Sequence, residues 1–349
     1  MQKRSNRWIN LGFQIAAVFL ALLFTTIVLI FSDAPPFQAY LNILLGSFGS
    51  FNQFSNVLVA WVPLLLATSG LLVTFTAGLW NIGIEGQITL GAIFSTALLR
   101  LTMNTAVPPW ISILLAIVAG MLGGAFWAAL TGVLKTYGGV NEIFGGLGLN
   151  FVATALTLWL IFGPWKRPGI GSMSGTEPFP ESLWLPQFAG SRLSPWSLVI
   201  AGVGVIVIYL LLQGTYFGLR LKAVGRNMRA AYILGIPTTR YMLLSFIVCG
   251  IFAGLAGAIQ VLAVYHRLIP SISSGYGYLG LLVAMLVNYS VVWMVPVSLF
   301  FAALNIGSIQ LPIVLKLDSS LSGVLQGALV LFVLMMQGVR QRYFQRVQR

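Results

Sequence analysis

The sequence predicts an all-α membrane protein: a polytopic bundle of about ten spanning helices, with both termini in the cytoplasm. Of its 349 residues, 58% are hydrophobic and only 7% are charged, and the mean hydropathy is +0.94. A soluble domain carries about a quarter charged residues. The apolar runs are continuous and about 20 residues long, the length of a spanning helix, whereas barrel strands alternate apolar and polar residues over shorter segments.

Ten segments have the length and apolar character of a span. They are 10–31, 56–77, 80–99, 110–134, 143–163, 196–213, 241–264, 276–292, 293–311 and 321–338. The first follows the basic start MQKRSNRW, but it is longer than a signal-peptide core and no small-x-small cleavage site follows it. We therefore interpret it as an uncleaved span.

The basic residues assign the sides of the membrane. With the N-terminus inside, thirteen Lys and Arg fall on the cytoplasmic side and six on the outer side, as the positive-inside rule requires. The same rule accounts for the net charge of +13, so no nucleic-acid partner is expected.

The chain is interpreted as one transmembrane domain over 1–349. Residues 1–55 hold the first span and an outer loop, 56–338 hold the core spans, and 339–349 form a basic cytoplasmic tail. The long outer loop, about 164–195, is rich in Pro, Gly and Ser and predicts an irregular cap. The long inner loop, about 214–240, is the most charged internal segment, and its AAYILGI stretch predicts a short amphipathic helix on the membrane surface or on a partner.

Several kinds of chemistry are excluded by composition. The one cysteine, Cys249, and the one histidine, His266, give no disulfide within the chain and predict no zinc site. No Gly-Lys dipeptide is present, so the phosphate-binding loop that needs it is absent, and GYGYLG at 275–280 lacks the preceding strand of a dinucleotide site. With no catalytic triad, carboxylate pair or metal set, neither an enzyme nor a cofactor is predicted.

Glycines recur at the spacing of helix-packing faces. Gly120 and Gly124 form one pair, and Gly250, Gly254 and Gly257 form a longer series. Small residues at such spacing let helix backbones approach closely in a membrane.

Polar residues interrupt the apolar stretch LWNIGIEGQITLGA, residues 79–92. Asn81, Glu85 and Gln87 fall there, and a charge at the bilayer centre costs at least about 2.5–3.5 kcal/mol. Gly83 and Gly86 predict a broken or short helix, and unwound backbone at depth is tolerated only against protein or a wet cavity. Two interpretations stay open: the segment lines a pathway, or Glu85 caps or joins neighbouring helices near the cytoplasmic face.

A second polar group opens the span 143–163. Asn141 has the position of a helix N-cap, followed by Glu142. Asn150 lies eight residues after Glu142, on nearly the same helix face. Asn288 is a further polar position at depth, and we group these four with Asn81, Glu85 and Gln87 as candidates for a span break or a translocation path.

Four stretches resemble the permeases of bacterial ABC importers for branched-chain amino acids, ribose and nucleosides. NIGIEGQITLGA resembles the signature of that group, and GVNEIFGGLGLNFVA at 139–153 is similar to its simple-sugar and nucleoside branch. The stretches 223–259 and 275–307 resemble the group's cytoplasmic loop with its next span and its last third. Together the similarity covers about residues 55–335.

The resemblance implies a permease subunit in the bacterial inner membrane, working with other chains. It implies two ATP-binding-cassette ATPases, a second permease chain, and a substrate-binding lipoprotein or periplasmic protein, all assembled around the lipid bilayer. It also implies that the inner loop couples ATPase motion to the spans. The residues carried over for that role are Gly225, Asn227, Ala230, Ala231, Gly235 and Ile236.

This chain departs from its relatives after GYGY, where they often carry an acidic residue and this chain has Leu279. The departure bears on substrate more than on fold. The leading interpretation is an ABC-importer permease for nucleosides or related simple sugars. The alternatives are a branched-chain amino acid permease and, from a different class, a proton-coupled secondary transporter that uses Glu85 or Glu142.

Overall fold

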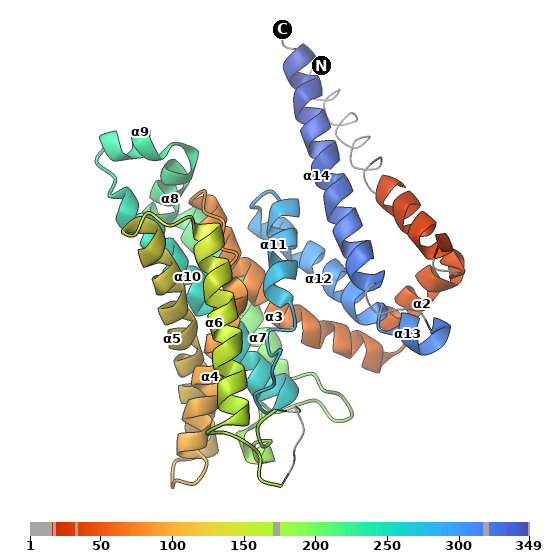
Figure 1. Ribbon diagram of the computed structural model, residues 1–349, viewed down its shortest axis with the longest axis vertical. Coiled ribbons are helices and arrows are strands. Elements are labelled where there is room, and N and C mark those ends of the chain that lie inside the picture. The colour runs from red at the N-terminus through yellow and green to blue at the C-terminus, as the bar shows by residue number, and fades with distance from the viewer. Residues whose placement is uncertain (1–15, 17–18, 32–33, 170–174, 317–320, 348–349) are drawn as a thin grey trace. The chain divides into compact units, whose positions relative to one another are not determined.

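The computed structural model describes residues 16, 19–31, 34–169, 175–316 and 321–347, and regular structure in them is helical throughout (Figure 1). The helices are α2 (Pro36–Phe48), α3 (Phe51–Thr76), α4 (Ile84–Thr102), α5 (Pro109–Thr136), α6 (Glu142–Phe162), α7 (Pro195–Gly214), α8 (Tyr216–Arg226), α9 (Met228–Ile233), α10 (Thr238–Ile259), α11 (Tyr276–Leu286), α12 (Val291–Gly307), α13 (Gln310–Leu315) and α14 (Leu321–Val347). A further helix covers Phe19–Phe31. A π-helical turn, Gln260–Tyr265, extends α10, and a 3₁₀ turn, Glu181–Leu183, lies in the outer loop.

Six of these helices are long and apolar enough to cross a membrane, and a bent pair, Phe19–Phe31 with Pro36–Phe48, makes up to seven among the described residues. Each of the ten expected segments overlaps a helix. The expected segment 80–99 corresponds to α4, which starts later, and the expected segment 276–292 corresponds to α11, which ends earlier. Helix α2 was not expected from the sequence. The predicted helical membrane bundle is therefore confirmed, while the number of its spans is established only approximately.

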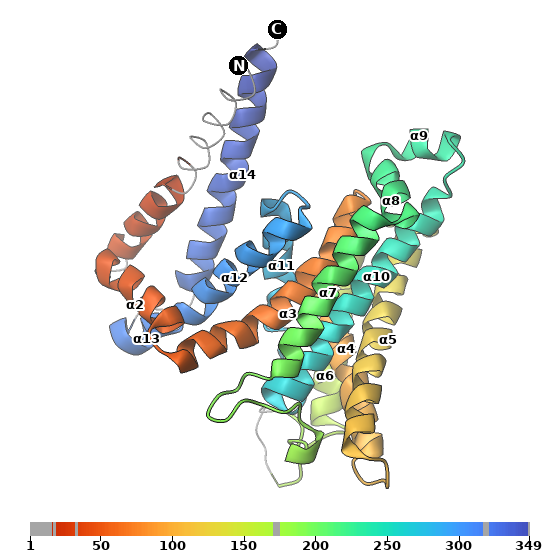
Figure 2. The same cartoon turned by 180° about the vertical axis from the view of Figure 1, so that it is seen from behind.

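The described chain divides into two compact units, 58–299 and a second unit of the residues before 58 with those after 299. In the larger unit, α4, α5, α6, α7 and α10 run side by side, with α8 and α9 at one end and the loop before α7 at the other (Figures 1 and 2). The end with α8 and α9 is the one that the charge distribution predicts to be cytoplasmic. The single-domain boundaries inferred from the sequence stay a prediction.

The centre of the larger unit is a contact among α4, α5 and α10 that glycines make possible. A methyl group added at Gly254 would overlap the carbonyl oxygen of Gly120, and one at Gly124 would overlap that of Gly250. A methyl at Gly257 would overlap the carbonyl oxygen of Ile88. Backbones at this distance leave no room for side chains, so the predicted role of the glycine series is confirmed.

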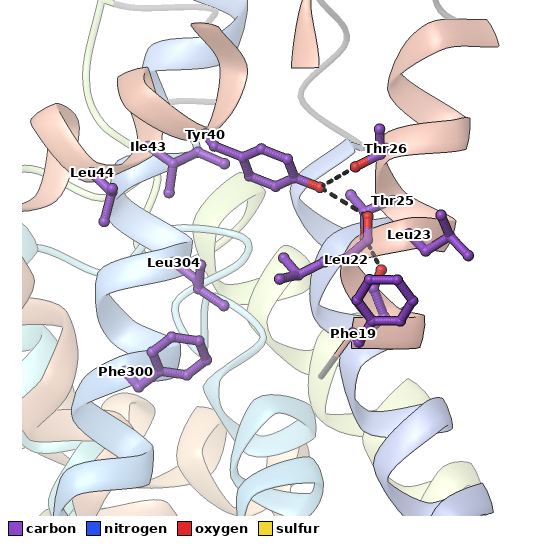
Figure 3. A pocket seen from close by; sticks show the side chains of 11 residues that line it. Phe19, Leu22, Leu23, Thr25, Thr26, Tyr40, Ile43, Leu44, Phe300 and Leu304 are labelled. Atoms are coloured by element: carbon purple, nitrogen blue, oxygen red, sulfur yellow. Dashed lines mark hydrogen bonds between the residues drawn. The ribbon is translucent and has the colours of Figure 1, made fainter. Parts of the chain in front are cut away.

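The smaller unit contains an apolar pocket of about 590 Å³ (Figure 3). It is lined by Phe19, Ala21, Leu22, Leu23, Thr25, Thr26, Tyr40, Ile43, Leu44, Phe300 and Leu304. Its polar side chains already have partners: the Tyr40 hydroxyl lies 3.1 Å from Thr26 Oγ1 and donates to Leu22 O, and Thr25 donates to Ala21 O. The pocket thus offers few polar groups to a hydrophilic solute.

Candidate functional site

The candidate site begins where α3 ends and α4 has not yet begun. Residues 77–83, here called the link, are not in a regular helix; Gly78 has φ +76° and Gly83 is the N-cap of α4. A methyl group at Gly83 would lie 3.0 Å from Gly146 Cα, so the link runs against the backbone of α6. The break that Gly83 and Gly86 predict is therefore present, just before Glu85.

Two of the predicted residues form a closed amide pair across the break. Asn81 Nδ2 donates to Gln87 Oε1 and Gln87 Nε2 donates to Asn81 Oδ1, both at 3.0 Å. Asn81 Nδ2 also lies 3.1 Å from the buried thiol of Cys249 on α10. Both amides are fully buried. The pair fixes the link to α4 and α10, which satisfies polar groups that the break leaves without helical partners.

Glu85 joins two helix N-termini. It lies in the first turn of α4, only 7% exposed, and its Oε1 accepts the backbone N–H of Tyr278 at 2.9 Å. The backbone N–H of Gly277 and the hydroxyl of Ser273 donate to the same carboxyl group. A carboxylate at the start of a helix satisfies free N–H groups and stabilises the positive end of the helix dipole. Glu85 therefore caps α11 from a distant part of the chain.

The two helices that meet at Glu85 run in opposite directions. Helix α4 leaves the predicted cytoplasmic end, while α11 returns towards it, and Tyr289, after α11, has its ring 5.9 Å from Phe75 near the end of α3. Asn288 and Tyr289 both have positive φ, 49° and 66°, and form the turn between α11 and α12. Asn288 thus lies at a span break, while a direct role in a path stays a prediction.

Helix α6 holds the link through one face. Asn150 Oδ1 accepts the Gly86 N–H at 2.8 Å, and its Nδ2 donates to Ile82 O at 2.9 Å. The Glu142 carboxylate forms a 2.6 Å ion pair with Lys135 and accepts the backbone N–H of Trp80. The shared face predicted for Glu142 and Asn150 is therefore the face that contacts the break. Asn141 accepts the Ile143 N–H at 2.9 Å and caps α6, as predicted.

The sequence reasoning missed a second polar group beside Glu85. Buried Gln260 donates to Ile272 O at 3.2 Å and lies 3.4 Å from Ser274 Oγ, while the Tyr265 hydroxyl lies 2.9 Å from the same Ser274 oxygen. With Ser273 on Glu85, these contacts hold the non-helical segment 266–275 that leads to α11. Gln260, a lone amide inside an apolar run, was the available signal; the π-helical turn that it starts was not readable from the sequence.

The outer loop is an ordered cap over the described part of its length. Backbone N–H groups of Thr176, Phe179 and Leu185 donate to the carbonyls of Leu268, His266 and Leu262. The Trp184 ring stacks on the His266 imidazole with centroids 3.7 Å apart. Burial lowers the pKa of His266 to about 4, and the nearby Arg192 charge acts in the same direction, against a hydrogen bond with Leu262. The imidazole is therefore neutral at pH 7.

The inner loop forms two helices where one was expected. The AAYILGI stretch contributes only its start to α9, which begins at Met228 with Asn227 as its cap, because the Asn227 side chain accepts the Ala230 N–H at 3.0 Å. The residues around that short helix expose apolar side chains, with Tyr232, Ile233 and Leu234 between 71% and 83% exposed. Ala230 and Gly235 are exposed, Ala231 is buried and Ile236 is half-buried. Gly235 has φ +79°, which favours glycine there.

Among the described residues no group of three His, Cys, Asp or Glu side chains could hold a metal ion. Asn81, Gln87, Glu85 and Asn150 pair with one another or with backbone groups where helices begin or break. Such an arrangement can hold non-helical backbone inside a bilayer.

The sequence matches the family described as the permease component of the branched-chain amino acid transport system, over residues 53–334. The chain belongs to this family. It is accordingly a multi-pass protein of the bacterial plasma membrane with a role in transport.

Several of its relatives are named as ABC transporter permeases. The chain is 30% identical to the glucose ABC transporter permease protein of Haloferax volcanii, over 94% of this chain and 88% of that protein. It is 24% identical to the guanosine ABC transporter permease protein NupP of Bacillus subtilis, over 93% of each. It is 25% identical to a second guanosine permease of that organism, NupQ, over 70% of this chain and 77% of that protein.

Proposed function

We propose that this chain is the permease subunit of an ABC importer for nucleosides or related simple sugars. The observation that carries the proposal is the family membership, taken with relatives that are named for guanosine and for glucose. Two of these relatives are guanosine permeases of one organism. That pair favours a diverged second permease as the partner of this chain. ATP hydrolysis is assigned to two separate ATPase chains and solute delivery to a binding protein.

The break around Glu85 supports a place on the translocation path. Helices whose N-termini meet inside a bilayer, with non-helical backbone between them, are a recurring way to build a solute site in transporters. In this chain Asn81, Glu85, Gln87 and Asn150 hold such a break together. We assign them the role of bracing the path, with Glu142, Asn141 and Asn288 at its edges.

The inner loop supports docking of an ATPase. Its exposed apolar group, Tyr232, Ile233 and Leu234, lies beside the exposed cations Arg226 and Arg229. A short helix with an exposed apolar face fits a groove on a partner protein. The residues assigned to the ATPase coupling loop are Gly225, Asn227, Ala230, Ala231, Gly235 and Ile236.

The test is uptake of labelled uridine by cells that carry the full native locus, with and without this gene. Gene-dependent uptake that excess guanosine blocks and leucine does not would support the nucleoside assignment. Loss of leucine or ribose uptake instead would keep the permease and overturn the solute. ATP depletion should stop uptake while an uncoupler alone should not; the reverse would support the proton-coupled alternative.

A further inference from the structure

The cytoplasmic helix α8 rests directly on the link. A methyl group added at Gly225, in the last turn of α8, would overlap the backbone carbonyl oxygen of Thr76 and lie 3.0 Å from Ala77 C. From the other side, a methyl at Gly78 would lie 3.4 Å from both Gly225 Cα and Gly225 O. Because every atom in this contact belongs to the backbone, neither side can make room by a change of rotamer.

The link that receives this contact leads without interruption to the buried polar site. The Trp80 backbone N–H donates to the Glu142 carboxylate, and the Asn81 amide pairs with Gln87. The Ile82 carbonyl accepts a hydrogen bond from Asn150. Glu85, two residues after the link ends, caps α11. A shift of Thr76 or Gly78 therefore strains contacts that hold α4 to α6 and α11.

Helix α8 is well suited to pass on a displacement as one body. Its Leu221 and Val224 are buried, Arg220 donates to the Tyr241 hydroxyl at 3.1 Å, and Lys222 donates to Gln213 Oε1 at 3.0 Å. It is joined through the single cap residue Asn227 to α9, whose neighbouring apolar side chains are exposed.

We propose that Gly225 is a positioning residue of the transport cycle: its bare backbone seats α8 on the link, so that displacement of α8 and α9 moves Asn81 and Glu85. This inference rests on the proposed function, because it needs a partner that moves α9. It adds a definite route from the cytoplasmic surface to the polar break, through the contact of Gly225 with Thr76 and Gly78.

The first test measures ATP hydrolysis and uridine uptake together, in proteoliposomes that hold the whole transporter. The transporter is purified from cells that express all of its subunits from the native locus. For Gly225→Ala we expect hydrolysis to continue while solute taken up per ATP falls about tenfold or more, the size of a typical coupling between sites. Gly214→Ala is the matched control, because a methyl there meets no atom within 4 Å at the end of α7. An unchanged ratio for Gly225→Ala, whether or not both rates fall, would overturn the proposal, since a merely structural defect lowers both rates together.

A second test uses the wild-type transporter, and so does not depend on a variant that folds. Amide hydrogen exchange is compared with and without bound non-hydrolysable ATP. Exchange in 221–226 and in 76–87 should change together, while the glycine contact of α5 with α10 stays constant. A change in 221–226 without one in 76–87 would contradict the proposed route. If wild-type liposomes show no ATP-dependent uridine uptake, the solute assignment fails, and the exchange experiment still tests the route.

Discussion

The larger unit holds its helices together in two different ways, in adjoining places. Between α5 and α10, glycines let backbone meet backbone, and the nearest atoms facing Gly124 and Gly254 are all backbone atoms. At the link, a few residues away along α4, the packing depends on amide and carboxylate side chains that bond to the backbone. Both regions are buried, but only the second is built around non-helical backbone.

The difference shows what each region can do. A glycine contact has one favourable geometry, because any displacement brings carbonyl oxygens into overlap or loses the close packing. A hydrogen-bonded break can exchange one set of partners for another, as transporters with discontinuous helices require. We infer that the glycine contact is the fixed frame and that the link is the part that rearranges.

The largest expected effect comes from filling the glycine contact. Gly254→Leu places a side chain where the carbonyl oxygen of Gly120 lies, and overpacking of this kind costs about 1–3 kcal/mol or more. We expect little folded protein in membranes, measured by size-exclusion chromatography of detergent extracts. Gly202→Leu on α7 is the control, because a methyl at Gly202 meets no atom within 4 Å. Equal yields of the two variants would show that α5 and α10 do not depend on this contact.

Next in size is the loss of the Glu85 carboxylate. Glu85→Leu leaves the N–H groups of Gly277 and Tyr278 without their acceptor, and each unpaired buried donor costs about 1–3 kcal/mol. Because the glycine frame is untouched, we expect the variant to insert but to lose about tenfold or more of its uptake. Glu85→Gln, which keeps one acceptor oxygen, should retain more uptake. Normal uptake by Glu85→Leu at a normal protein level would remove Glu85 from the functional site.

The sequence was most informative where one type of residue determines the structure. The glycine spacing predicted the close packing, and Gly83 with Gly86 predicted the break. Asn141 could be recognised as a cap because its position before the apolar run is local information. Fold class followed from composition and from the apolar runs of about 20 residues, since so few charged residues leave only the membrane as an environment and runs of that length are typical of spanning helices.

What the sequence could not provide were the partners across the break. Glu85 bonds to Tyr278 and Ser273, about 190 residues later in the chain, and no local pattern relates them. The π-helical turn that begins at Gln260, before the non-helical segment that leads to α11, also has no local pattern in the sequence. For the same reason the two interpretations of Glu85 stayed open, because they differ only in what its carboxylate contacts.

A smaller effect separates Asn141, the N-cap of α6, from Asn150 inside that helix. Asn150 bonds both to Gly86 N and to Ile82 O, whereas Asn141 accepts a single hydrogen bond from the exposed start of α6. Asn150→Leu should lower the thermal unfolding midpoint more than Asn141→Ala, whose cost is about 1 kcal/mol for a lost cap. Uptake should fall more for Asn150→Leu than for Asn141→Ala. Equal shifts for the two variants would mean that the link needs no support from α6.

The smallest expected effect concerns the outer cap, where the His266 imidazole stacks on Trp184 at the start of the second non-helical segment, 266–275. Burial lowers the pKa of His266 to about 4, below the value of about 6.5 for a free histidine. The unfolded cap therefore binds a proton more readily than the folded one, so stability is full above pH 6.5 and is lost as the pH falls towards 4. The side chain is only partly buried, so solvent screening keeps the effect small.

Limited proteolysis of the outer cap should accelerate as the pH falls from 6.5 towards 4. The variant His266→Phe, which keeps a ring to stack on Trp184, should abolish this pH dependence. If the cap is equally resistant at pH 7 and pH 4.5, the imidazole does not help to hold it.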